Sequence, residues 1–107
     1  MEYITPVLVN RHKGEFDIYI GRGTIWGNPF PRDPGAGISR QVSIQMYREY
    51  LYECLENGTI TTDDVLSLSG LRIGCSCAPL ECHGDVIIEV FNTIVEMLNG
   101  ESSNEKI

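Results

Sequence analysis

Apolar and β-branched residues cluster in three short stretches of the chain. Residues 3–9 predict a first strand, and Pro6 suits an edge position or a late strand start. Residues 16–20 alternate apolar side chains on one face and predict a second strand. The connection between these two stretches is short, which predicts a β-hairpin. Residues 71–77 also alternate, and they predict a third strand.

Two longer stretches follow a helical period instead. Apolar residues recur at three- and four-residue steps over residues 39–57, where Ser39 is a suitable N-cap and Gly58 a stop. A short helical turn follows over residues 61–68. A last helix is predicted over residues 84–99, with its apolar residues again on one face.

This order of elements predicts an α/β fold. We expect a small sheet of about three or more strands, in β-β-α-β-α order, packed by two main helices and with the third strand central. A chain of 107 residues has room for one hydrophobic core. We therefore expect a single domain over residues 1–100 and a flexible tail over residues 101–107.

Composition narrows the class of protein. Apolar residues make up 42% of the chain and charged residues 21%, which is typical of a globular domain. Nothing resembles a signal peptide, and no apolar run approaches the roughly 20 residues of a membrane helix. We expect a cytoplasmic protein with no membrane partner, whose four cysteines are thiols or metal ligands.

Charge is unevenly distributed along the chain. The net charge is −7, but residues 1–50 carry six basic and five acidic side chains, whereas residues 51–107 carry two and ten. Such an acidic chain is not expected to bind nucleic acid, since affinity for its backbone comes mainly from Lys and Arg. The arginines of the first half still suit one small anionic ligand.

A glycine- and proline-rich segment over residues 21–37 follows the second predicted strand. Glycine turns at strand ends let backbone N–H groups approach an anion, and the carboxyl ends of strands in open α/β sheets are where ligands bind. The alternative is a loop that folds over the core and buries its aromatic residues. The predicted ligand site comprises Arg22 as a bidentate donor, Gly23, Trp26 as a stacking face, Asn28, Arg40, His83 and Asp85.

Two motifs carry a resemblance to a known family. The first is the segment IGRGTIWGNPF at residues 20–30, and the second is CSCAPLECHGD at residues 75–85. Together they resemble the phage and bacterial family called domain of unknown function 4326. Ser76 departs from the aromatic residue that relatives often carry there. The resemblance implies kinship over roughly residues 7–95 and implies no mechanism.

The second motif also suggests metal chemistry. Cys75 and Cys77 lie on one face of the third strand, and Cys82 and His83 follow, so these four side chains form a candidate zinc site. The spacing is not a standard zinc signature, and buried structural thiols are the alternative. Cys82 is also a candidate nucleophile, because it precedes a helix N-terminus.

Two functional hypotheses follow. The first is binding of a small anionic nucleotide-like ligand, with either sequestration or processing, as in a phage protein that acts on nucleotide-derived signals or precursors. The second is a protein-interaction module whose acidic half contacts a host protein and whose cysteines are structural. Whether the protein is an enzyme is left open. An open edge strand further predicts a homo-oligomer.

Overall fold

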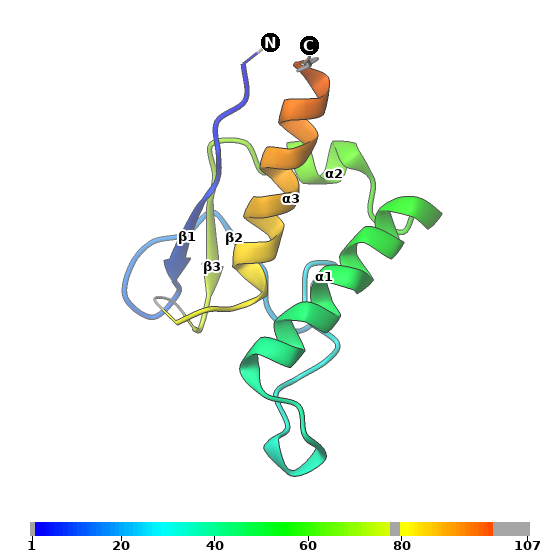
Figure 1. Ribbon diagram of the computed structural model, residues 1–107. Helices are drawn as coiled ribbons and strands as arrows, with labels where there is room; N and C mark the ends of the chain where they lie inside the picture. The colour runs from blue at the N-terminus through cyan, green and yellow to red at the C-terminus, as the bar shows by residue number, and fades with distance from the viewer. Residues whose placement is uncertain (1, 78–79, 100–107) are drawn as a thin grey trace.

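The computed structural model of the protein describes residues 2–77 and 80–99. It forms a small α/β domain with one sheet and helices on one side of it (Figure 1). The elements are β1 (Val7–Asn10), β2 (Ile18–Tyr19), the short 3-10 helix η1 (Pro34–Ala36), α1 (Arg40–Asn57), α2 (Thr62–Leu66), β3 (Arg72–Cys75) and α3 (His83–Leu98).

The three strands form a parallel sheet in the order β1-β3-β2. Ile73 of β3 is opposite Leu8 of β1 on one side and Ile18 of β2 on the other. The predicted α/β class and the central position of the third strand are confirmed. The predicted β-hairpin is wrong, because β1 and β2 do not pair with each other and instead flank β3.

The connection from β1 to β2 explains why no hairpin forms. Residues 11–17 return along the sheet across β3, so both flanking strands run in the same direction as β3. Gly74 makes this crossing possible: a Cβ there would lie 2.7 Å from Cγ of Phe16. Asp17 then accepts hydrogen bonds from the backbone N–H of Arg72 at 2.7 Å and from its guanidinium at 3.1 Å. Successive side chains alternate between faces, so this crossing covers the face opposite the buried Ile73.

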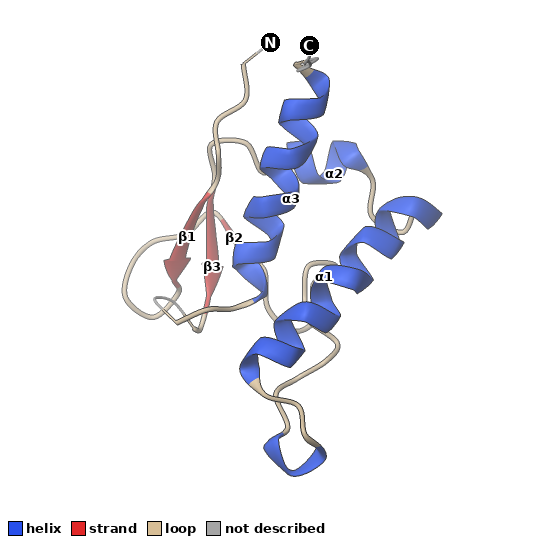
Figure 2. Ribbon diagram, in the orientation of Figure 1, coloured by secondary structure: helices blue, strands red, loops and turns tan. Residues whose placement is uncertain are grey.

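Helix α3 covers the other face of the sheet, and α1 and α2 pack mainly against α3 (Figure 2). The core between these layers contains the largest fully buried side chains, among them Tyr47, Leu51, Ile73 and Phe91. Burying an apolar side chain of this size stabilises the fold by about 1.5–3 kcal/mol. No helix among the described residues is long and apolar enough to cross a membrane.

The helix boundaries follow the capping signals. Ser39 Oγ accepts from the backbone N–H of Val42 at 3.2 Å, and Gly58 ends α1 with a φ of 84°. Thr61 begins α2 with a capping box that includes Asp64. These predicted boundaries are confirmed to within a residue or two. The predicted tail at residues 101–107 lies outside the described residues.

Candidate functional site

A pocket of about 530 Å³ lies where the carboxyl ends of β2 and β3 meet the N-termini of α1 and α3. The end of β3 and the N-termini of α1 and α3 lie in the lower half of Figure 1. Residues after β2, the glycine-rich segment, the start of α1 and the residues between β3 and α3 all contribute walls. The glycine-rich segment and the cysteine motif, which are about 50 residues apart in the sequence, thus share one pocket.

Three arginines line this pocket: Arg22, Arg32 and Arg40. Arg22 and Arg32 are exposed and make no hydrogen bond or ion pair with any described residue. Arg40 donates from Nη1 to the backbone oxygen of Glu81 at 2.9 Å. None of the three is paired with a carboxylate in the described part of the chain, so their positive charges remain available to a ligand.

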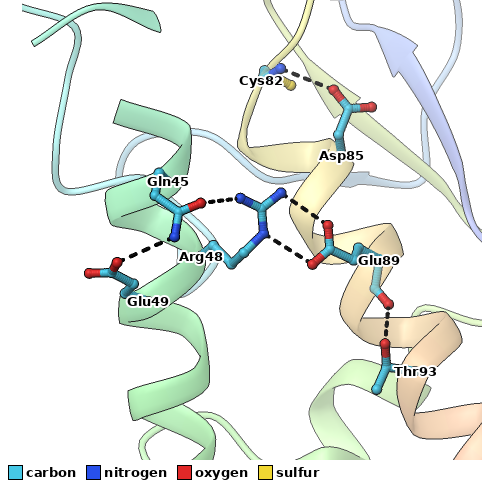
Figure 3. Close-up of polar contacts among 7 residues, drawn as sticks. All are labelled: Gln45, Arg48, Glu49, Cys82, Asp85, Glu89 and Thr93. Atoms are coloured by element: carbon cyan, nitrogen blue, oxygen red, sulfur yellow. Dashed lines mark hydrogen bonds and ion pairs between the residues drawn. The ribbon is translucent and has the colours of Figure 1, made fainter. Parts of the chain in front are cut away.

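Two arginines away from the pocket, Arg48 and Arg72, are paired with carboxylates, whereas Arg11 lies over the Tyr19 ring at 4.8 Å and has no carboxylate partner among the described residues. Arg48 of α1 makes two hydrogen bonds of 3.0 Å with the carboxylate of Glu89 on α3 (Figure 3). Arg72 pairs with Asp17 at 3.1 Å. Its hydrogen bonds lower the pKa of the Asp17 carboxyl below the ordinary value. The three pocket arginines thus differ from Arg48 and Arg72 in having no carboxylate partner among the described residues.

Asn28 lines the pocket but supports its wall. Its Nδ2 donates to Ser43 Oγ at 2.9 Å, and its Oδ1 accepts from the backbone N–H of Phe30 at 2.8 Å. Ser43 Oγ in turn donates to the backbone oxygen of Phe30. These bonds fix the glycine-rich segment to the first turns of α1, so Asn28 positions the segment that carries Arg32.

Trp26 does not offer the stacking face predicted for it. Its side chain is 3% exposed and belongs to the core, and its backbone oxygen accepts from the Tyr47 hydroxyl at 2.8 Å. For Trp26 the alternative interpretation, a loop that buries its aromatic residue, is confirmed. Tyr19 is the aromatic residue that lines the pocket. Gly23 is exposed, has a φ of 92° and is not among the lining residues.

His83 lies at the start of α3 and faces the pocket. Its Nε2–H donates to the backbone oxygen of Ile20 at 2.6 Å, and its ring meets Tyr47 edge to face with centroids 5.0 Å apart. Burial lowers the pKa of His83 below its ordinary value, against the opposing effects of the Ile20 carbonyl and Asp85. His83 is therefore a neutral imidazole at pH 7 with its orientation fixed.

Asp85 serves helix α3 and not the pocket. Its carboxylate accepts from the backbone N–H of Cys82 at 3.1 Å and completes the capping box that begins α3 (Figure 3). Asp85 is not among the residues that line the pocket. The structure thus brings Arg22, Asn28, Arg40 and His83 together as predicted, and it places Gly23, Trp26 and Asp85 elsewhere.

Three of the four cysteines also line the pocket: Cys75, Cys77 and Cys82. All four are thiols rather than disulfide partners. Sγ of Cys82 accepts from the backbone N–H of Gly84 at 3.3 Å and so acts as the N-cap of α3. Burial, with a smaller contribution from Cys75, raises the pKa of the Cys82 thiol to about 12. Cys82 is therefore protonated at neutral pH, which argues against its predicted role as a nucleophile.

The zinc site is not supported by the arrangement of these groups. Within residues 2–77 and 80–99, no three or more His, Cys, Asp or Glu side chains are placed to hold a metal ion. Nε2 of His83 is already bonded to Ile20. Zinc held by Cys75, Cys77, Cys82 and His83 stays a prediction that elemental analysis of the purified protein would test.

His83 gives the fold a defined dependence on pH. Its pKa is lowered in the folded state, so the unfolded chain binds more protons as the pH falls below 6.5. The free energy of unfolding is expected to fall there, by at most about 1.4 kcal/mol per pH unit. Urea unfolding between pH 7.5 and 5.5, a range chosen to span roughly one unit either side of the ordinary histidine value, measures this slope. His83→Gln should flatten it.

Sequence reasoning missed several lining residues. Arg32 follows Pro31 in the glycine-rich segment, and Tyr19 is the last residue of β2, directly before the pocket turn. The available signal for Tyr19 was its place at a strand's carboxyl end beside the glycine turn. The available signal for Arg32 was a basic residue inside the glycine- and proline-rich segment.

A three-stranded parallel sheet with helices on one face and a pocket at the strand ends defines a small α/β domain. The family model described as Domain of unknown function (DUF4326) matches residues 7–93, and the chain belongs to this family. The chain is 38% identical over 87 residues to the "Uncharacterized 12.4 kDa protein in nrdA-td intergenic region" of Enterobacteria phage T4. That match covers 81% of this chain and 78% of the phage protein. No solved structure matches the chain.

Proposed function

We propose that this protein binds a small anionic, nucleotide-like ligand in the pocket between the strand ends and the N-termini of α1 and α3. The observation that carries the proposal is the set of pocket arginines without carboxylate partners, Arg22, Arg32 and Arg40. In a chain with fifteen acidic residues, three guanidiniums at one pocket without a carboxylate partner are available to an anion. Guanidinium groups bind phosphate with paired, charge-assisted hydrogen bonds.

The rest of the pocket suits a ligand with an organic part. Its volume of about 530 Å³ falls within the range of roughly 300–1,000 Å³ typical of small-molecule sites. Tyr19, Pro31 and Ile44 supply apolar surface on its walls, against which a ribose or base can pack. Its place at the carboxyl ends of parallel strands is the usual place for a nucleotide in an open α/β sheet.

Calorimetric titration tests the proposal with ADP, AMP, ribose 5-phosphate and adenosine as probes. We expect the phosphorylated compounds to bind and adenosine to bind far more weakly, because adenosine lacks the group that the arginines hold. Affinity should also fall as salt is added, since Arg22 and Arg32 are exposed.

A matched control keeps the interpretation clear. Lys13 lies in an exposed turn outside the pocket, so Lys13→Ala removes one positive charge and should leave affinity unchanged. If no phosphorylated probe binds, or if adenosine binds as well as ADP, the proposal is wrong. The hypothesis of a protein-interaction module is then favoured.

A further inference from the structure

The side chains that line the pocket carry more positive than negative charge. Besides the three arginines, Glu81 is the single Asp or Glu among the described residues that line it. Glu81 is exposed, and its backbone oxygen, not its carboxylate, is the group that Arg40 holds. The pocket therefore presents two more positive than negative side chains to whatever enters it.

Such a set of side chains is unsuited to a nucleotide that arrives with Mg²⁺. Sites of that kind hold the ion with carboxylates or hydroxyls as well as with the phosphates. Two serine hydroxyls line the pocket, and that of Ser43 is occupied, because it donates to the backbone oxygen of Phe30 and accepts from Asn28, which leaves Ser76. No metal-holding group of three acidic, Cys or His side chains exists among the described residues. A divalent cation in this pocket would also share it with the three guanidiniums that line it.

We propose that the pocket takes its ligand as the metal-free anion, a nucleoside diphosphate or diphosphate ester whose phosphates contact Arg22, Arg32 and Arg40 directly. The proposal rests on the proposed function and adds the state in which the ligand binds. The guanidiniums supply the neutralisation that Mg²⁺ supplies in many nucleotide sites. Mg²⁺ in solution then competes with the protein for the diphosphate. Phosphoryl transfer from a magnesium-bound triphosphate is correspondingly disfavoured as the chemistry of this pocket.

The test is a titration of the full chain with ADP, once with excess EDTA and once with excess MgCl₂ at equal ionic strength. We expect ADP to bind roughly three- to tenfold more weakly with Mg²⁺, because the ion removes negative charge that the arginines would otherwise meet. AMP, which chelates Mg²⁺ poorly, is the matched probe, and its affinity should change much less. This comparison separates competition for the diphosphate from general screening by a divalent salt.

Each outcome decides between the alternatives. ADP binding that is tighter with Mg²⁺, or unchanged, overturns the metal-free proposal and leaves the proposed function standing. If ADP binds more tightly with Mg²⁺, Glu81→Ala shows whether the Glu81 carboxylate holds the ion. The gain in affinity from Mg²⁺ should disappear in this variant if it does. Absence of ADP binding under both conditions overturns the proposed function and the metal-free proposal together.

Discussion

Replacing Arg22 and Arg32 together by alanine should weaken ADP binding by about a hundredfold or more. Each charge-assisted hydrogen bond to a phosphate contributes about 1.5–3 kcal/mol, which is roughly ten- to hundredfold in affinity. Both side chains are exposed and bond to no described residue. The double variant should therefore keep the melting temperature of the parent protein. Calorimetry for binding and a thermal melt for stability measure the two quantities on one preparation.

Two further substitutions make this test specific, one that keeps the charge in the pocket and one that removes a charge outside it. Arg22→Lys retains a positive charge without the planar pair of donors, so its affinity should lie between those of the parent and Arg22→Ala. Arg48→Ala removes an arginine that is bonded to Glu89 outside the pocket. That change should leave ADP affinity intact and cost about 1 kcal/mol or less of stability. If Arg22→Ala unfolds the protein or leaves binding unaltered, Arg22 is not a ligand-binding residue.

Gly27→Ala should lower the free energy of unfolding by roughly 1–3 kcal/mol, the usual cost of forcing atoms into a filled space. A Cβ on Gly27 would lie 2.8 Å from the backbone oxygen of Gly21 and 3.3 Å from its carbonyl carbon. These are backbone atoms of the turn that carries Arg22, so they cannot move aside as a side-chain tip would. The turn must shift, and ADP affinity should fall with it.

Gly14→Ala is the matched control for this glycine. Nothing lies within 4 Å of a Cβ on Gly14, and its φ is not among the positive values of the described glycines. Alanine there should be neutral or stabilise by up to about 1 kcal/mol through the unfolded state. Urea unfolding of both variants compares them directly. Equal free energies of unfolding for Gly27→Ala and the parent protein would contradict this account, because the turn would then accommodate a Cβ at position 27.

Local signals in the sequence predicted most helix boundaries, whereas strand pairing depended on distant residues. The caps at Ser39 and Thr61 each accept from an N–H group three residues away, and such contacts can be read from neighbouring positions. The hairpin prediction failed because the partner of both β1 and β2 is β3, more than 50 residues further along. Nothing near residues 11–17 indicates that Phe16 crosses a glycine at position 74.

The difference between local signals and contacts to distant residues also explains which site residues could be predicted from the sequence. Strand ends followed by glycine turns correctly placed Arg22 and His83 at one edge of the sheet. Trp26 could not be assigned from the sequence, because an aromatic residue in a loop suits either a ligand or the core, and the Tyr47 hydroxyl that fixes its backbone comes from α1. The position of Asp85 suited two roles, a helix cap at the start of α3 and a ligand-binding residue after a strand end. In the structure its carboxylate caps α3.

Nuclear magnetic resonance of ¹⁵N-labelled protein during a titration with ADP, recorded with excess EDTA, tests the existence of this ligand site most directly. The Nε–Hε signals of Arg22, Arg32 and Arg40 should shift together with the backbone amides around Gly21 and Ser76. The corresponding signals of Arg48 and Arg72, which are held by carboxylates away from the pocket, should stay in place. Shifts centred on Arg72 and the opposite face of the sheet, or no shifts at millimolar ADP, would contradict a nucleotide site in this pocket.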